Sequence, residues 1–359
     1  MAALGFHDKA FDEGTLTKLE LFQLYTREWL PVFLAREEHA PAALHLFDFF
    51  AGPGTDAAGV LGSPLRTLET LKEYANSGFA GWKRTKIVCH FFDASARKVD
   101  ALTHMAASRC HGIENVSLDI QQLEFEKSFA RYAQTLEDRA VAKLLLIDQF
   151  GVDSVTPEVF RRLIGFPRTD FLFFISSNTL HRFREHPAIK QRITPAADYY
   201  HVHRAVFDYY RQLIPHGTRY YLAPFSIKKG SNIYGLIFGS AHPLGMDKFL
   251  SVAWRKDRTN GEADFDINRD HLTESEYFDL DGMFRPRKVS AFESALESAL
   301  RGKSARDEWA ILELCFEHGV TRQHAKPVLQ RLVDAKILEA DFRVPDVKNI
   351  RAPRAVRFL

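Results

Sequence analysis

Short, almost uninterrupted apolar runs recur along the first half of the chain, with helically spaced segments between them. The runs cover residues 44–50, 86–93, 115–120, 143–148 and 170–176. Continuous apolar character, rather than alternation, indicates parallel strands that are covered on both faces. Predicted helices lie at about 17–36, 64–74, 96–108, 125–139 and 156–164. This order predicts an α/β fold with a doubly wound, mostly parallel sheet.

The alternation of predicted strands and helices ends after a helical region at about 196–215. Residues 219–240 are predicted to form two strands around the turn signal Lys229-Gly230-Ser231-Asn232. Five parallel strands followed by a β-hairpin resemble the Rossmann-like fold of class I S-adenosylmethionine-dependent methyltransferases, whose last strand runs antiparallel. A dinucleotide dehydrogenase is expected to continue with another strand and helix instead.

The C-terminal part has a different plan. Polar, poorly periodic sequence at 257–290 predicts a connector, and helices are expected at 307–319 and 322–338. Two short strands around a basic, proline-containing turn follow, which gives the outline of a small α+β module of the winged-helix type. The predicted division is therefore a methyltransferase-like domain at 1–256, a connector at 257–300 and a winged-helix-like domain at 301–359.

Composition narrows the class of protein. The chain has 359 residues, of which 46% are apolar and 26% are charged, as in ordinary globular proteins. No apolar run approaches the roughly 20 residues that span a bilayer, and the acidic N-terminus does not resemble a signal peptide. The three cysteines are scattered and form no C-x-x-C pair. We therefore expect a cytoplasmic protein with no membrane contact, disulfide framework or bound metal.

The loop after the first predicted strand carries the first candidate site. The segment DFFAGPG places Asp48 at the strand end and two glycines behind it, where open α/β sheets bind ligands. Ser63 and Pro64 are suited to begin the next helix, so a long loop precedes it. This loop contains no Gly-Lys-Ser/Thr, which disfavours a phosphate loop of the Walker type here. The residues expected to contact a cofactor here are Asp48, Ala51, Gly52, Pro53 and Gly54.

Acids at the next two strand ends extend this site. Asp93 ends the second run and is suited to accept both hydroxyls of a ribose. Its distance along the chain from Gly54 exceeds the roughly 20 residues of the dinucleotide fingerprint, which disfavours NAD. Asp119 is expected to close the third strand and to reach an adenine amino group, although a solvated strand end is an equally good interpretation.

The fourth strand ends in Asp148-Gln149-Phe150-Gly151, at the position that faces the substrate in methyltransferases. The candidate catalytic residues are Asp148, which could orient or deprotonate a nucleophile, and Phe150, which could stack on a base. Enzymes that methylate amino groups usually carry Asp/Asn-Pro-Pro-aromatic here. Cytosine-C5 enzymes share the DFFAGPG appearance, but their Pro-Cys nucleophile is absent from this chain.

Charge is unevenly distributed. Residues 285–359 hold 15 Lys/Arg against 10 Asp/Glu, a net +5, whereas the whole chain has +2. This asymmetry favours an anionic partner for the tail. The candidate phosphate contacts are Arg322, Lys326, Arg331, Arg351 and Arg354. A protein-binding module with a solvated basic face explains the same pattern. The histidines at 181, 186, 201 and 203 lack the supporting cysteines or carboxylates of a metal site.

Together these motifs resemble a named family. KLELFQLYTREWL, FDFFAGPGTDAAGVLGSPLRTLE, LLLIDQFG and SNIYGLIFGSAHPLG are similar to segments of the three-Cys-motif partner proteins (TcmP), over about residues 17–250. The resemblance implies S-adenosylmethionine as cofactor. It also implies a partner, an iron–sulfur, radical-SAM-like protein that carries the three-cysteine motif. Members usually show Asp-Pro-aromatic-Gly at the fourth strand, so Gln149 departs from the pattern.

Two functions follow from the sequence. The first is an S-adenosylmethionine-binding, methyltransferase-like protein that acts on or at DNA or RNA. The second is a non-catalytic scaffold that recruits DNA or protein to the radical-SAM-like partner, which the DQFG substitution favours. An enzyme that uses a different nucleoside ligand remains open. A nuclease is disfavoured, because no paired carboxylates stand at metal-site spacing.

Overall fold

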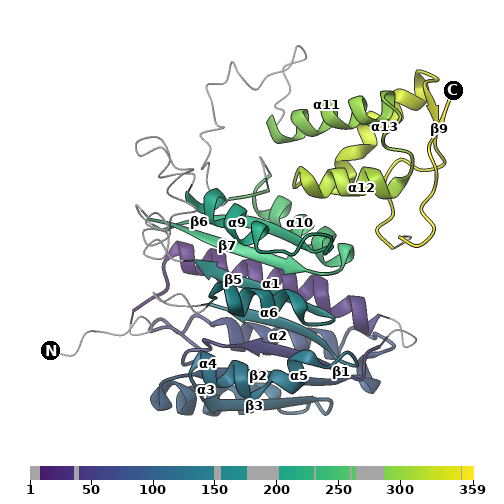
Figure 1. Ribbon diagram of the computed structural model, residues 1–359. Helices are drawn as coiled ribbons and strands as arrows, with labels where there is room; N and C mark the ends of the chain where they lie inside the picture. The colour runs from purple at the N-terminus through teal and green to yellow at the C-terminus, as the bar shows by residue number, and fades with distance from the viewer. Residues whose placement is uncertain are drawn as a thin grey trace. The chain divides into compact units, whose positions relative to one another are not determined.

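The computed structural model describes residues 9–35, 40–148, 155–175, 202–229, 232–258, 261–263, 287–348 and 350–359. Contacts within the chain divide it between Ala241 and His242 into two compact units (Figure 1). This division falls ahead of the limit expected at residue 256. The three-domain division itself stays a prediction.

The first unit contains, among its described residues, a seven-stranded sheet with the order β3-β2-β1-β4-β5-β7-β6. Its strands are β1 (Ala43–Asp48), β2 (Lys86–Asp93), β3 (Val116–Gln122), β4 (Ala142–Ile147), β5 (Thr169–Ile175), β6 (Tyr221–Lys229) and β7 (Asn232–Ser240). The first five strands pair in parallel, and β7 runs antiparallel to both β5 and β6. The predicted doubly wound sheet with a terminal hairpin is confirmed, and the fold is Rossmann-like and methyltransferase-like. The turn at 230–231 lies outside the described residues.

Burial follows position in the sheet. All six residues of the central strand β4 are buried, whereas every residue of β3, at the sheet edge, is half-buried or exposed. This difference explains why β4 is apolar apart from Lys143 while β3 reads VSLDIQQ. The prediction from apolar runs therefore locates inner strands more reliably than edge strands.

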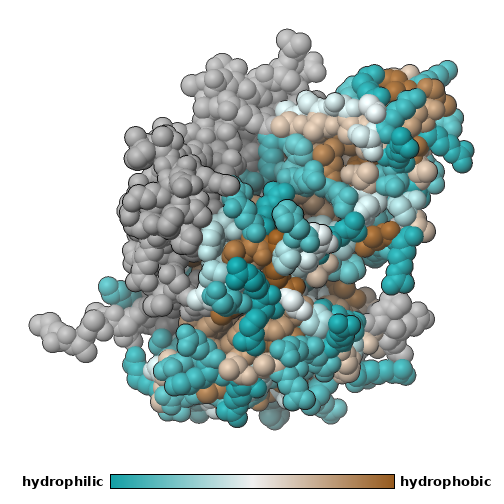
Figure 2. Space-filling view, viewed as in Figure 1, coloured by the Kyte–Doolittle hydropathy of each residue, from teal (hydrophilic) through white to brown (hydrophobic). Residues whose placement is uncertain are grey.

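Helices cover both faces of the sheet (Figure 1). On one side α1 packs against α2 and α2 against α3; their bounds are α1 (Glu13–Leu34), α2 (Ser63–Ala75) and α3 (Ala96–Cys110). The other face buries a phenylalanine-rich core beneath α4 (Phe125–Arg131), α5 (Ala133–Glu137), α6 (Pro157–Gly165) and α9 (Val202–Gln212). The 3₁₀ turn η3 (Trp82–Arg84) precedes β2. In the space-filling view, hydrophilic residues dominate the surface over α3, α4 and α5 (Figure 2).

The second unit is helical with a small two-stranded sheet. Its elements are α10 (Pro243–Lys256), α11 (Arg287–Arg301), α12 (Glu308–Glu317), η6 (Arg322–His324), α13 (Ala325–Asp334), β8 (Leu338–Glu339) and β9 (Arg357–Phe358). α11, α12 and α13 enclose an apolar core with the strand segments. Trp254 of α10 belongs to this unit, because its indole N–H donates to Gly319 O (2.9 Å) and its ring lies 4.5 Å from that of His324. Three helices followed by a two-stranded sheet match the element order of a winged-helix module, which stays an interpretation.

Two expectations for this unit need correction. The range 257–300 was predicted as a connector, but α11 occupies 287–301 and buries Phe292, Leu296 and Leu300 at helical spacing. The single helix expected at 322–338 is a 3₁₀ turn followed by α13, which ends at Asp334, and Lys336 adopts a positive φ of 56°. None of the described helices combines the length and apolar character that a bilayer crossing needs.

Candidate functional site at the carboxyl edge of the sheet

The loop between β1 and α2 begins with two glycines in left-handed backbone conformations. Gly52 has φ 66° and Gly54 has φ 95°, a region that side-chain-bearing residues rarely adopt. The Gly52 N–H donates to Asp93 Oδ2 (3.1 Å), so the loop joins the end of β1 to the end of β2. The neighbouring Ala51 is buried and donates its N–H to Phe92 O, and Pro53 is half-buried.

The packing around Gly54 leaves no room for a side chain. A Cβ atom there would lie 3.0 Å from Met105 Cε and 3.1 Å from side-chain carbons of Leu102 and Leu65. The space in the direction of a side chain is therefore filled by α2 and α3, and the contact of Gly54 with a cofactor stays a prediction. Glycine is still required, since both the backbone angle and the neighbours exclude a side chain.

Hydrogen bonds join the two ends of the remaining loop, residues 54–62. Gly62 N–H donates to Gly54 O (2.7 Å), and Thr55 and Leu61 form an antiparallel bridge. Asp56 is 5% exposed and accepts the N–H groups of Ala58 and Val60 on one carboxylate oxygen. This arrangement fixes the base of the loop, while the tip at 57–59 is exposed.

Asp93 ends β2 as predicted and lies beside this loop. Its Oδ1 accepts the Ser95 N–H (2.9 Å), its Oδ2 accepts the Gly52 N–H, and Lys98 Nζ lies 3.5 Å from Oδ2. The side chain is 12% exposed. A carboxylate offers about four acceptor positions, so Asp93 keeps capacity for hydroxyl donors at the end of its strand.

The expected position of Asp119 was wrong. β3 continues to Gln122, so Asp119 lies inside the strand, opposite His90 in the register, and Gln122 is the residue opposite Asp93. Successive side chains of a strand point to opposite faces. Gln122 therefore shares a face with Asp93, whereas Asp119 lies on the other. Sequence reasoning missed Gln122, because the polar edge strand gives no apolar signal for its end.

Asp119 instead belongs to a polar network on the face of the sheet that α4 and α5 cover. It accepts hydrogen bonds from Gln121 Nε2 and the Tyr132 hydroxyl, and Oδ2 lies 2.8 Å from His90 Nδ1. These hydrogen bonds outweigh burial and hold the pKa of Asp119 well below its usual range. The network continues from His90 Nε2 to His45 Nδ1 (2.8 Å), and burial lowers the pKa of His45 to about 4. The network is internal to the sheet and helps to fix the edge strand.

Asp48 is buried at the end of β1, with 2% of its surface exposed. The Ser63 hydroxyl donates to its Oδ2 (2.5 Å) and the Phe50 N–H to its Oδ1 (3.0 Å). Burial raises the pKa of Asp48 to about 7, and the negative charges of Asp148 and Asp93 add to this effect. Asp48 therefore links β1 to the first residue of α2 and lies close to the other two strand-end acids.

Asp148 follows β4 and is paired with a residue that sequence reasoning missed. Lys18 Nζ of α1 donates to both carboxylate oxygens, at 2.6 and 2.5 Å. The two side chains are 11% and 15% exposed. Lys18 stands 130 residues away in the sequence, and the only signal was its place on a predicted helix near the start of the chain. Gln149 and Phe150 lie outside the described residues.

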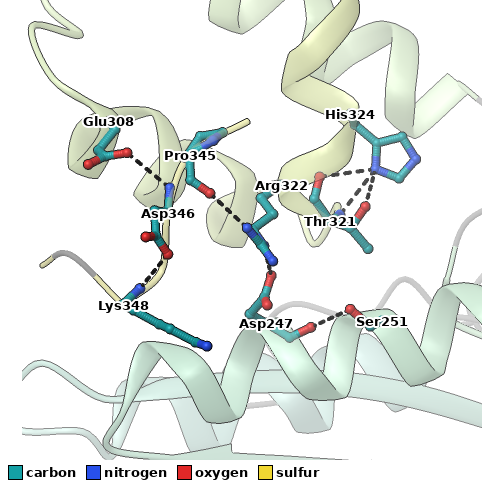
Figure 3. Close-up of polar contacts among 9 residues, drawn as sticks. All are labelled: Asp247, Ser251, Glu308, Thr321, Arg322, His324, Pro345, Asp346 and Lys348. Carbon is teal, nitrogen blue, oxygen red and sulfur yellow. Dashed lines mark hydrogen bonds and ion pairs between the residues drawn. The ribbon is translucent and has the colours of Figure 1, made fainter. Parts of the chain in front are cut away.

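The predicted phosphate contacts of the tail fall into two groups. Three arginines hold the second unit together. Arg322 lies 3.2 Å from Asp247 Oδ1 of α10 and donates to Pro345 O (Figure 3). Arg331 pairs with Glu297, and Arg354 pairs with Glu308. Lys326 and Arg351 are exposed. The structure therefore brings the five residues into one unit but gives three of them intramolecular partners.

The histidines at 181, 186 and 201 lie outside the described residues, and the side chain of His203 does as well. Among the described residues, no group of three or more His, Cys, Asp or Glu is placed to hold a metal ion. Ser176, Ser177 and Asn178 are also outside the described range.

No protein-family model and no curated protein matches the chain. Solved structures with a similar arrangement include Trm1 from Pyrococcus horikoshii in complex with S-adenosyl-L-methionine, at 8% identity and a TM-score of 0.39 over 64% of this chain and 56% of that chain. TYW2 from M. jannaschii in complex with AdoMet matches at 10% identity and a TM-score of 0.30, over 64% and 76% of the two chains. The O-methyltransferase TomG from Streptomyces achromogenes in complex with SAM matches at 11% identity and a TM-score of 0.33, over 64% and 90%.

The chain thus spans 56% of the length of the first of these proteins. Because all three TM-scores are below 0.5, the assignment of a methyltransferase-like fold rests on the strand order and the terminal antiparallel hairpin. Membership of the three-Cys-motif partner family stays a prediction.

Proposed function

We propose that the protein binds S-adenosylmethionine at the carboxyl edge of its sheet and acts as a methyltransferase. The observation that carries the proposal is the junction of Gly52 with Asp93, which places a left-handed glycine and a strand-end carboxylate together at the ends of neighbouring strands β1 and β2. Open α/β sheets bind nucleotide ligands at this edge, with an acid on the ribose hydroxyls.

The donor and acceptor groups present fit this cofactor. Asp93 has acceptor capacity for ribose hydroxyls, and Gln122 beside it offers an amide with both donor and acceptor atoms. The three strand-end acids also favour a ligand that carries positive charge. When bound, S-adenosylmethionine supplies a methyl group on a positively charged sulfur. The chain's own groups would hold the cofactor and orient the acceptor, which is the main demand of an in-line displacement.

Nucleic acid is our proposed acceptor, with a three-Cys-motif radical-SAM-like protein as partner. The net +5 of residues 285–359 supports an anionic partner, and Lys326 and Arg351 are exposed cations in that region. The scaffold function is the second candidate. It is favoured by the Lys18–Asp148 ion pair, which engages the carboxylate that was expected to face the acceptor.

Calorimetric titration of S-adenosylmethionine and S-adenosylhomocysteine tests the proposal. The wild type is expected to bind both, and Asp93→Asn is expected to weaken both by about 10-fold or more, because a hydrogen bond to a charged group is worth about 1.5–3 kcal/mol. Asp100→Asn is a matched control, since Asp100 lies exposed on α3. Absence of binding to the wild type at millimolar ligand would overturn the methyltransferase proposal and leave the scaffold.

A further inference from the structure

The Lys18–Asp148 ion pair lies where an open α/β sheet binds its ligands. Strand β1 stands between β2 and β4, and the helices that follow β1 and β4 cover opposite faces of the sheet. This reversal creates a topological switch point, and ligands bind outside the carboxyl ends of the strands there. Asp48 and Asp148 occupy these two strand ends.

The sequence near the start of α1 sets the position of Lys18. Asp12 accepts the Thr15 N–H (2.8 Å) and caps the helix, which fixes its first turn. Lys18 follows in the next turn, where its ammonium reaches both oxygens of Asp148 and lies 5.1 Å from the centre of the Phe174 ring of β5. The ammonium is therefore held in place by Asp148, which follows β4, and by Phe174 of β5.

Such a pair is a poor device for stability alone. Removing two charges from water costs several kcal/mol per ion, and their attraction often fails to offset this cost. Asp48 adds a second carboxyl group close by, whose pKa responds to the charge of Asp148. The switch point thus holds the Lys18 ammonium group next to two carboxyl groups, those of Asp148 and Asp48.

An α-amino acid carries one carboxylate and one ammonium group, so each of its charges is opposite to one charge of the Lys18–Asp148 pair. We propose that Lys18 and Asp148 form the subsite for the amino-acid end of S-adenosylmethionine, with the Lys18 ammonium binding the ligand's carboxylate and the Asp148 carboxylate binding its ammonium group. This inference rests on the proposed function and assigns Asp148 to binding instead of proton abstraction. It explains why the pair is nearly buried yet lies at the ligand-binding edge.

Two ligands separate this subsite from the nucleoside site. S-adenosylhomocysteine carries the amino-acid end, whereas 5′-methylthioadenosine carries the same nucleoside without it. For Lys18→Met, the affinity for S-adenosylhomocysteine is expected to fall by about 10- to 100-fold, while that for 5′-methylthioadenosine changes by about 2-fold or less. Arg27→Met is the matched control. Arg27 lies on α1, as Lys18 does, but it pairs with Glu73 of α2 and lies away from the strand ends.

Thermal unfolding of each variant checks that it is folded. If Lys18→Met leaves Asp148 unpaired and fails to fold, the double variant Lys18→Met/Asp148→Asn removes both charges and takes its place. Equal losses for both ligands, or no loss for either, would overturn the subsite while the proposed function stands. Failure of the wild type to bind S-adenosylhomocysteine or S-adenosylmethionine would overturn the proposed function and this inference together.

Discussion

Two buried carboxyl groups, one in each unit, are satisfied in opposite ways. Glu308 at the start of α12 is 1% exposed and accepts hydrogen bonds from Asp346 N–H (3.0 Å), Arg354 N–H (2.9 Å) and the Arg354 guanidinium (2.8 and 3.1 Å). Although burial opposes ionisation, these bonds lower the pKa of Glu308. Asp48 is equally buried, but it faces other acids, and its pKa is raised to about 7.

The difference separates a structural role from a binding role. The chain itself supplies the cation for Glu308, so this carboxylate joins α12 to the segment before β9. At the edge of the first unit, three acids meet two lysines, Lys18 beside Asp148 and Lys98 beside Asp93, and the excess of acids favours a ligand with positive charge. A buried carboxyl group thus has different uses according to how far the chain neutralises its charge.

The largest effect is expected from removing the charge of Glu308. Glu308→Gln removes the negative charge from a nearly buried acceptor of two backbone N–H groups and the Arg354 guanidinium, and a hydrogen bond to a charged group is worth about 1.5–3 kcal/mol. Chemical unfolding should show this loss, with reduced hydrogen-exchange protection of the amides at 346 and 354. Glu317→Gln, on the exposed side of the same helix, is the control. An unfolding curve like that of the wild type would contradict a structural role for the charge of Glu308.

An intermediate effect, which depends on pH, is expected at Asp48. Its pKa is about 7 in the folded protein against 3.8 in the unfolded chain, so the folded state binds the extra proton between these values. The contribution of Asp48 to stability is therefore complete below about pH 4 and is lost as the pH rises to about 7. Asp48→Asn should flatten the pH dependence of the unfolding free energy by up to about 1.4 kcal/mol per pH unit in this window. Parallel curves for the variant and the wild type would contradict a raised pKa.

The smallest effect is expected at Arg331, another residue predicted to contact phosphate. Arg331 pairs with Glu297 near the surface, and Arg301 also binds this carboxylate. Arg331→Met should change the unfolding free energy by about 0.5 kcal/mol or less, as for other exposed pairs. Arg354→Met, measured beside it, should destabilise far more, because it leaves Glu308 buried without its cation. Equal effects of the two substitutions would show that burial does not govern these pairs.

The sequence predicted the sheet well because most residues of its inner strands are apolar. The limits of β2 were predicted without error, and β1, β4 and β5 differ by one or two residues at an end. Asp93 and the Gly52 turn also lie where they were expected, since both depend on local chain geometry. The helix α11 was missed, although Phe292, Leu296 and Leu300 recur at the four-residue spacing of an amphipathic helix.

The remaining parts of the site depend on contacts between distant segments. The end of β3 is set by its pairing with β2, so Asp119 could not be placed from VSLDIQQ alone. Lys18 meets Asp148 across 130 residues, and Arg354 meets Glu308 across 46. Charge patterns in the tail suggested free cations, but only the folded structure shows that Arg322, Arg331 and Arg354 already have anionic partners in the same unit.

The closed loop after β1 has a consequence for how this protein can change. Its base is pinned by the Gly62–Gly54 hydrogen bond and by Asp56, whereas a side chain added at Gly59 would meet no atom within 4 Å. The entropic penalty for lengthening an exposed tip is small and grows only with the logarithm of its length. Related proteins could therefore acquire insertions at 57–59, and with them new surface for recognition, without moving the glycine turn that adjoins Asp93.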